Sequence, residues 1–138
     1  MSLYVDASCL LKRYLKEPDS AQAERVLMSD AQWVTGRHTA IEVRRNLARD
    51  LDAASASAAA SLFQRDWQLM LIVELDERTC ELAAMYAETT GVRTLDALHL
   101  GAAQRFGNGE AAFATCDLRQ ARAARSLGWT VLGPSGSG

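Results

Sequence analysis

Short apolar runs alternate along the chain with longer segments in which apolar residues recur at helical spacing. The apolar runs predict strands at residues 3–5, 32–35, 70–73, 111–115 and 129–132. The segments with helical spacing predict helices at residues 7–16, 20–29, 39–51, 53–67, 76–91, 94–107 and 118–127. Strands that alternate with helices are typical of a mostly parallel sheet with helices on both faces.

Helix boundaries are indicated by residues that stop or cap a helix. Pro18 ends the first helix, because the residue before a proline disfavours helical dihedral angles, and Gly36 is expected to break the second strand. Thr39 and Glu42 have the spacing of a capping box, and Thr94 is expected to cap the helix that follows it. The helices predicted at residues 39–51 and 94–107 therefore each begin close to an acidic residue, Glu42 in the first and Asp96 in the second.

The length of 138 residues is that of one compact domain. We expect residues 1–133 to form a single domain and residues 134–138, a run rich in glycine and serine, to form a flexible tail of the kind that cloning adds. No apolar run approaches the length of a membrane span, and the first strand begins without a signal stretch, so a cytoplasmic protein is expected.

The three cysteines are Cys9, Cys80 and Cys116. Their number is odd, their spacing matches no zinc motif, and each lies in an apolar stretch, so we expect buried, reduced thiols.

The net charge of −2 argues against a broad basic surface for nucleic acid. Arginines nevertheless cluster beside acidic positions, as at Arg13, Arg45, Arg49 and Arg119. Arginine binds phosphate through two parallel hydrogen bonds, so these residues are candidates for holding a phosphate-bearing substrate locally. The alternative is that they belong to solvated helix faces, paired with neighbouring acids.

Four acidic residues stand where a strand or turn leads into a helix, namely Asp6, Glu42, Asp96 and Asp117. Ligands of parallel sheets bind at the carboxyl ends of the strands, and Asp6 and Asp117 directly follow two of them. Carboxylates gathered at one edge repel each other, and a hard divalent cation with oxygen ligands is the usual reason for such a set. The alternative is that each acid only caps its helix.

These acids lie in short motifs whose order resembles that of a PIN domain, and among PIN domains a toxin ribonuclease of the VapC type. The motifs are VDAS at 5–8, EVRR at 42–45, DALHL at 96–100 and TCD at 115–117. The resemblance runs from about residue 3 to residue 132. It implies a three-layer α/β/α fold with a central five-stranded parallel sheet, and an acidic pocket that binds Mg²⁺ or Mn²⁺.

The same resemblance implies roles for individual residues. Its catalytic set is Asp6, Glu42, Asp96 and Asp117; its metal ligands are Asp6, Asp96 and Asp117; its supporting hydroxyls are Ser8 and Thr115; and Arg45 and Arg49 are expected to bind substrate. The implied activity is hydrolysis of RNA phosphodiester bonds by a metal-activated water, leaving 5′-phosphate ends. The implied partners are a VapB-like antitoxin and a second copy of the chain.

Other classes agree less well with these residues. A haloacid-dehalogenase-like enzyme requires a second Asp where Ser8 stands, and no glycine-rich phosphate loop follows the first strand. A histidine-based ribonuclease is disfavoured because His38 and His99 form no recognisable pair in the sequence; we expect His99 either to pack in the core or to orient Asp96. The main alternative is a catalytically inactive PIN-like module that binds RNA or protein.

Overall fold

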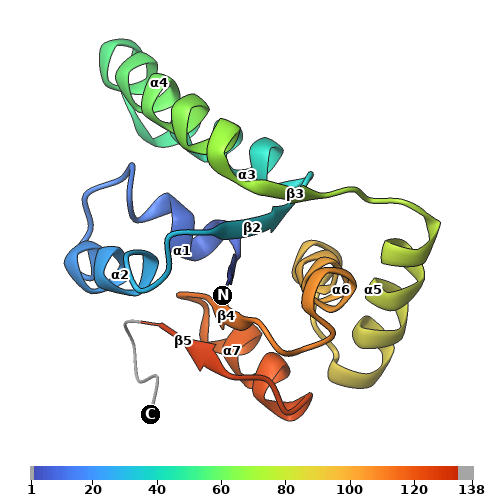
Figure 1. The fold of residues 1–138 in the computed structure, drawn as a ribbon. Coiled ribbons are helices and arrows are strands. Elements are labelled where there is room, and N and C mark those ends of the chain that lie inside the picture. The colour runs from blue at the N-terminus through green and yellow to red at the C-terminus, as the bar shows by residue number, and fades with distance from the viewer. Residues whose placement is uncertain (1, 134–138) are drawn as a thin grey trace.

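A parallel five-stranded sheet in the order β3-β2-β1-β4-β5 forms the centre of the molecule (Figure 1). The computed structural model describes residues 2–133, so the predicted tail at 134–138 lies outside the described residues. The strands are β1 (Leu3–Val5), β2 (Trp33–Gly36), β3 (Leu71–Val73), β4 (Ala112–Ala114) and β5 (Val131–Leu132). The predicted parallel sheet is therefore confirmed.

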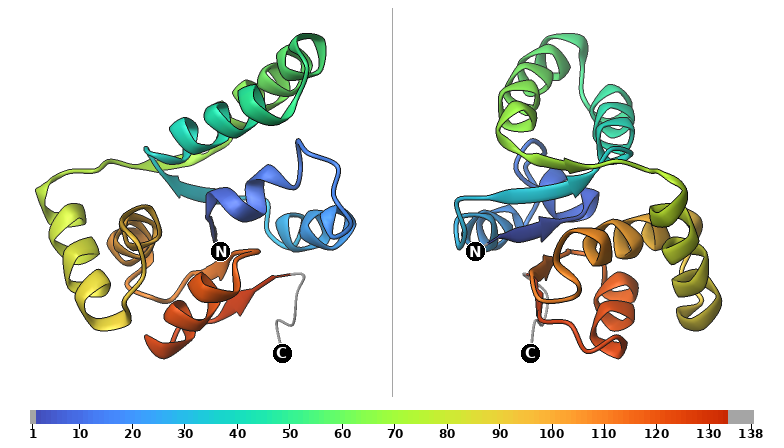
Figure 2. Two further views of the ribbon diagram at one scale, coloured as in Figure 1. Left: turned by 180° about the vertical axis from the view of Figure 1, so that it is seen from behind. Right: turned by 45° about the vertical axis from the view of Figure 1, so that its right-hand side comes forward.

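Helices cover both faces of this sheet and give the predicted three layers. One face carries α1 (Ala7–Leu11), α2 (Ser20–Leu27), α3 (Thr39–Asp50) and α4 (Ala53–Leu69), and the other carries α6 (Thr94–Gly107) and α7 (Leu118–Ser126). Helix α5 (Glu77–Thr90) packs against α6 (Figures 1 and 2). Within residues 2–133, none of the helices has the length and apolar character needed to cross a bilayer.

The central strand β1 shows why its sequence is apolar throughout. Leu3 and Val5 point into the cluster formed with α1 to α4, whereas Tyr4 points into the cluster formed with α6 and α7. Successive side chains of a strand face opposite sides, so a strand covered on both faces must be apolar at every position. Tyr4 stacks on Phe113 of β4, with ring centroids 5.3 Å apart. Each layer is thereby fixed to the strand that ends in Asp6.

Several predicted boundaries are corrected by the structure. Helix α1 ends at Leu11 rather than at residue 16, because the amides of residues 12–14 bond to carbonyls three residues back and form tight turns. Gly36 does not break β2 but is its last residue. The predicted capping box at Thr39 is wrong, because its hydroxyl bonds to Thr35 and His38 occupies the N-cap position. Thr94 is likewise inside α6, after the N-cap residue Arg93.

The expectation of three buried thiols is also only partly correct. Cys9 is buried and Cys116 is half-buried, but Cys80 is exposed, and all three are free. The buried face of α5 consists of Thr79, Leu82 and Ala83 instead of including Cys80. Cys80 lies next to Thr79 in sequence and therefore about 100° around the helix from it, which turns its side chain to solvent.

Close contact between α5 and α6 depends on Gly101. A Cβ atom at this position would lie 2.7 Å from the Thr79 carbonyl oxygen and 2.9 Å from the Ala83 nitrogen, which are backbone atoms. We expect Gly101→Ala to lower the free energy of unfolding by about 1–3 kcal/mol, the usual cost of overpacking a core. Urea unfolding would measure it, with Gly107→Ala as the control, where a Cβ atom meets only the Cβ of Ala111. Equal stability of both variants would contradict the prediction.

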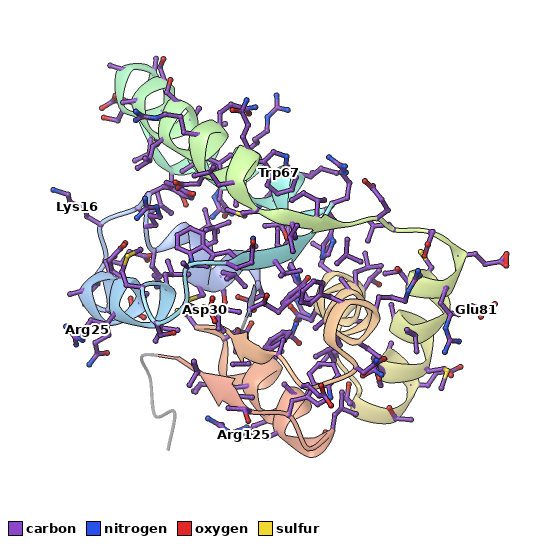
Figure 3. The ribbon with its side chains drawn as sticks, in the orientation of Figure 1. Lys16, Arg25, Asp30, Trp67, Glu81 and Arg125 are labelled. Atoms are coloured by element: carbon purple, nitrogen blue, oxygen red, sulfur yellow. The ribbon has the colours of Figure 1, made fainter. Side chains whose placement is uncertain are left out.

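Helix α4 is mostly exposed, and only its last turns contribute to the core. Phe63 is buried, and its ring lies 5.5 Å from that of Trp67. Figure 3 shows Trp67 above the sheet near the end of α4, whereas the first turns of the helix extend beyond the sheet beside α3. The alanine-rich start of α4 is thus a helix, as predicted, but it packs on α3 instead of the sheet.

Candidate active site

The structure brings all four predicted acids to the carboxyl edge of the sheet. Asp6 follows β1 and is the N-cap of α1, and Asp117 follows β4 and is the N-cap of α7. Glu42 and Asp96 lie in the first turns of α3 and α6. Helices α1, α3 and α7 each follow a parallel strand and so begin at the edge where the strands end, whereas α6 follows α5 and leads back to the start of β4, so it also begins at that edge.

Asp6 is the most enclosed of these acids, with 2% of its surface exposed. Its Oδ1 accepts hydrogen bonds from Ser8 Oγ at 2.7 Å and from the Cys9 amide at 3.1 Å, and its Oδ2 accepts one from Thr115 Oγ1 at 2.5 Å. Burial raises the pKa of Asp6, and the interaction with His99 and these hydrogen bonds oppose that rise. The carboxylate is therefore held in one orientation.

The two hydroxyls also connect Asp6 to the loop that carries Asp117. Ser8 Oγ accepts a hydrogen bond from the Cys116 amide at 2.9 Å, and Thr115 Oγ1 accepts one from the Asp117 amide at 3.1 Å. Each hydroxyl thus donates to Asp6 and accepts from the backbone after β4. This arrangement fixes the start of α7 relative to the end of β1.

Asp117 and Asp96 lie close enough to influence each other. Asp117 Oδ1 accepts hydrogen bonds from the amides of residues 119 and 120, so this oxygen caps α7, as the alternative interpretation of the four acids expected. Burial raises the pKa of Asp96, and the negative charges of Asp117 and Glu42 raise it further. The buried Gln120, which sequence reasoning missed, donates from Nε2 to the Asp96 carbonyl at 2.9 Å. In the sequence, the signal for Gln120 was its place in the first turn of the helix that Asp117 caps.

Glu42 is held by His99, and not by the arginines near it in sequence. His99 Nε2 lies 2.8 Å from Glu42 Oε1, and His99 Nδ1 lies 2.8 Å from the Tyr4 hydroxyl. The Gly36 amide donates to the same hydroxyl at 3.1 Å. One proton assignment satisfies all three bonds: Tyr4 donates to Nδ1, and Nε2–H donates to Glu42. His99 is therefore packed and hydrogen-bonded, and its predicted contact with Asp96 is replaced by one with Glu42.

The ability of these acids to hold a cation follows from their environment. Within residues 2–133, the ion pairs of lysines and arginines are with other acids, so Asp6 is a buried carboxylate with the neutral ring of His99 near it and no lysine or arginine partner. Such a group is costly unless a cation compensates it. In the same part of the chain, no three carboxylates place oxygens within 4.8 Å of one another. The four acids therefore do not form a closed coordination shell in this structure, and of the four only Asp117 lines a groove.

The predicted substrate-binding arginines lie in different places. Arg49 lines a groove of about 620 Å³ together with Ser8 and Asp117, so it lies beside the acids. Arg119, one of the arginines considered as a phosphate ligand, lines the same groove, and so does Lys12, which was not considered. Arg45 instead lines a separate groove of about 520 Å³ between α3 and α4, which contains none of the four acids. The structure thus places Arg49, but not Arg45, in the groove that contains Asp117.

Burial of His38 gives a testable pH dependence. Its pKa is lowered to about 3, mainly by burial, whereas an unfolded histidine titrates near 6.5. The fold favours the neutral form of His38. The free energy of unfolding is therefore unaffected by this group above pH 6.5 and decreases as the pH falls from 6.5 toward the pKa of His38 in the folded state. In EDTA we expect the wild type to lose up to about 1.4 kcal/mol per pH unit more than His38→Leu between pH 6.5 and 5.

Urea unfolding at several pH values would check this expectation. The difference between wild type and His38→Leu removes the contributions of Asp6 and Asp96, whose pKa values His38 does not shift. Parallel stability curves for the two proteins would contradict a neutral, buried His38.

Comparison with known proteins agrees with this geometry. The family model of the PIN domain matches residues 3–126. The chain belongs to the PIN domain family. It is 31% identical over 134 residues to ribonuclease VapC46 of Mycobacterium tuberculosis, which covers 97% of this chain and 98% of that protein.

Solved structures of other proteins show the same fold at lower identity. Mycobacterium tuberculosis VapC20, described as a toxin that cleaves the sarcin-ricin loop, superposes with a TM-score of 0.70 at 20% identity over 88% of this chain and 94% of that one. VapBC2 of Rickettsia felis, solved on a DNA fragment of its promoter, gives a TM-score of 0.69 at 10% identity over 96% and 98% of the two chains. Both comparisons agree with a PIN-like α/β/α fold for this chain.

Proposed function

We propose that this PIN domain is a metal-dependent endoribonuclease of the VapC type and the toxin of a toxin–antitoxin pair. The observation that carries the proposal is Asp6, a buried carboxylate that is oriented by Ser8 and Thr115 and forms no ion pair with a lysine or arginine of the described residues. Two further acids lie at the same edge of the sheet, Asp96 in the first turn of α6 and Asp117 at the N-cap of α7. The relative VapC46 carries the name ribonuclease, which supports the same activity.

The cation in this proposal is Mg²⁺ or Mn²⁺, held by Asp6, Asp96 and Asp117, with Glu42 as the fourth acid of the pocket. Oxygen ligands suit these hard ions. Burial raises the pKa of both Asp6 and Asp96, and the negative charges of Asp117 and Glu42 raise that of Asp96 further, so a cation would stabilise the charged form of each. When bound, such an ion supplies charge neutralisation at phosphate and a coordinated water of lowered pKa.

The protein's own residues supply orientation and substrate binding. Ser8 and Thr115 hold Asp6 through both oxygens, so its direction does not depend on a cation. Lys12, Arg49 and Arg119 line the groove beside Asp117 and provide positive charge for the phosphates of an RNA strand. Glu17 and Asp50 line the same groove and pair with Lys12 and Arg49, so the phosphates of bound RNA would replace these carboxylates as partners of the two cations.

The same proposal covers substrate and partners. The substrate is RNA, as the ribonuclease name of VapC46 supports. A VapB-like antitoxin is the protein partner, supported by the VapBC2 assembly from Rickettsia felis, and the chain forms a homodimer in the cytoplasm. The alternative is a PIN domain that binds RNA or protein without cutting it, and the following experiment distinguishes the two.

The test is cleavage of a mixed set of structured and single-stranded RNAs by the purified chain with Mg²⁺, with Mn²⁺ and with EDTA. We expect cutting that requires metal and leaves 5′-phosphate and 3′-hydroxyl ends. Cleavage that persists in EDTA, or that leaves 2′,3′-cyclic phosphate ends, would refute the metal mechanism. RNA binding without cutting in any metal would support the non-catalytic alternative.

A further inference from the structure

His38 is a buried histidine for which the fold provides no hydrogen bond. It is 3% exposed, and neither Nδ1 nor Nε2 has a hydrogen-bond partner among the described residues. The imidazole lies over Gly36, where a Cβ atom would come 2.5 Å from His38 Cε1, so the absence of a side chain at Gly36 makes room for the ring. Buried polar groups without partners are rare, and each calls for an explanation such as a bound ion.

The unpartnered ring faces two other groups that can ligate a metal. Its centroid lies 4.1 Å from that of His99, and its Nε2 lies 3.8 Å from Glu42 Oε1. Glu42 Oε1 is in turn 2.8 Å from His99 Nε2. One donor atom from each residue lies within 4.8 Å of the others, and among residues 2–133 this is the only such group of histidine, cysteine or acidic side chains.

The fold brings these donors together from two helices. His38 and Glu42 are separated by one turn at the start of α3, and His99 comes from α6 across the carboxyl edge of the sheet. Four-coordinate ions with bonds of about 2.0–2.1 Å require donors about 3.4 Å apart, so donor atoms that lie within 4.8 Å of one another need to close by about 1.4 Å at most. Two imidazoles, one carboxylate and an open fourth position form a known ligand set for Zn²⁺.

The state of the imidazoles suits a metal with affinity for nitrogen. Burial lowers the pKa of His38 to about 3 and that of His99 to about 4, so both rings are neutral at pH 7. An ion at His99 Nε2 would replace the hydrogen bond to Glu42 and select the other tautomer, in which Nδ1–H donates to the Tyr4 hydroxyl. Metal-binding histidines usually donate from the second nitrogen in this way. Nitrogen ligands select Zn²⁺, Co²⁺ or Ni²⁺ over Mg²⁺.

We propose that His38, Glu42 and His99 form a binding site for a transition-metal ion of the Zn²⁺ class, next to the pocket of Asp6, Asp96 and Asp117 but with a different donor set. Binding at these three residues does not require the nuclease activity proposed above. Glu42 belongs to both sets, so the two sites are adjacent and share one side chain.

Nuclear magnetic resonance of the histidine rings tests the site in the unmodified protein. The chain contains two histidines, so the ring signals of an untagged sample report on His38 and His99 alone. We expect one equivalent of Zn²⁺ to shift both sets of ring signals, and Mg²⁺ to leave them in place. Unchanged ring signals with excess Zn²⁺ would overturn the proposal.

Matched variants distinguish this site from the carboxylate pocket. Calorimetric titration with Zn²⁺ should show affinity reduced more than about tenfold in His38→Leu, and unchanged within about twofold in Asp6→Asn. The opposite order, with affinity lost in Asp6→Asn and retained in His38→Leu, would place the ion among the carboxylates and refute the proposal. Circular dichroism verifies that each variant is folded. If His38→Leu does not fold, the ring signals of the wild type with and without Zn²⁺ decide the outcome.

Discussion

Asp6→Asn is expected to fold and to lose more than about 100-fold in metal-dependent RNA cleavage. Substitution of the hydrogen-bond partners of metal ligands typically lowers metal affinity or activity by about 10–100-fold. Removing the charge of a ligand itself should lower activity by more than that range. The change keeps the shape of the side chain and its cap to the Cys9 amide through Oδ1. Cleavage of one fluorescent RNA at saturating Mg²⁺ measures the effect.

Stability provides a second readout of the same variant. The folded pKa of Asp6 lies above its unfolded value, because burial disfavours the charged form. Ionisation therefore costs stability as pH rises through the folded pKa, and the cost remains at pH 7. In EDTA we expect the stability of Asp6→Asn relative to wild type to increase from pH 4 to pH 7. Added Mg²⁺ should raise the melting temperature of the wild type and leave that of Asp6→Asn almost unchanged.

Asp76→Asn is the matched control. Asp76 is also an N-cap aspartate, accepting from the Thr79 amide, but it pairs with Arg105 near the end of α6, far along that helix from Asp96. It should lose some stability and keep full cleavage. If Asp6→Asn also kept full cleavage, Asp6 would be only a cap, and the proposed pocket would be wrong.

His99→Leu is expected to lower the free energy of unfolding by about 2–4 kcal/mol. The change leaves two partly or fully buried groups without their partner, the Tyr4 hydroxyl and the Glu42 carboxylate, and each such loss costs about 1–3 kcal/mol. Leucine is similar in volume to histidine, so the cost should come from lost hydrogen bonds more than from a cavity. Urea unfolding at pH 7 in EDTA measures it.

A double-mutant cycle identifies the source of this effect. Tyr4→Phe removes the hydroxyl that His99 contacts, so Tyr4→Phe combined with His99→Leu should cost less than the sum of the two single changes by about 1 kcal/mol or more. Thr89→Val, which removes an exposed hydroxyl bonded within α5, is the control and should be additive with His99→Leu. Additive costs for Tyr4→Phe and His99→Leu would show that the pair does not stabilise the fold.

The order and type of the elements could be predicted because local patterns were strong. The three residues of β1 are apolar and covered on both faces, and the helix from Glu77 to Thr90 ends at Gly91, which adopts the left-handed conformation with φ of 78°. The caps were harder, because Thr39 and Thr94 have the right residue type but lie one position inside their helices. Which hydroxyl caps a helix depends on where the chain turns, and tertiary contacts such as Thr35 to Thr39 decide that.

The candidate site divides in the same way. The four acids, Ser8 and Thr115 were found by motif, and the structure places them at one edge of the sheet. Gln120, the Tyr4–His99–Glu42 chain and the unpartnered ring of His38 were not found, since each depends on contacts between segments far apart in sequence. Arg45 and Arg49 share a helix, yet only Arg49 lies in the groove beside Asp117, because residues four apart on α3 still differ in their distance from that edge.

The sequence by itself determined the alternation of strands and helices, the parallel sheet and the identity of the acids, because apolar periodicity and residue type are local properties. Only the tertiary structure decided which acid is buried, which partner each side chain has and which donors converge. Asp6 and Thr115 are 109 residues apart in sequence, and Glu42 and His99 are 57 apart. Hydrogen bonds at such separations follow from the packing of α3 and α6 at the sheet edge. Burial there removes water, so each buried polar group needs a hydrogen-bond partner from the protein itself.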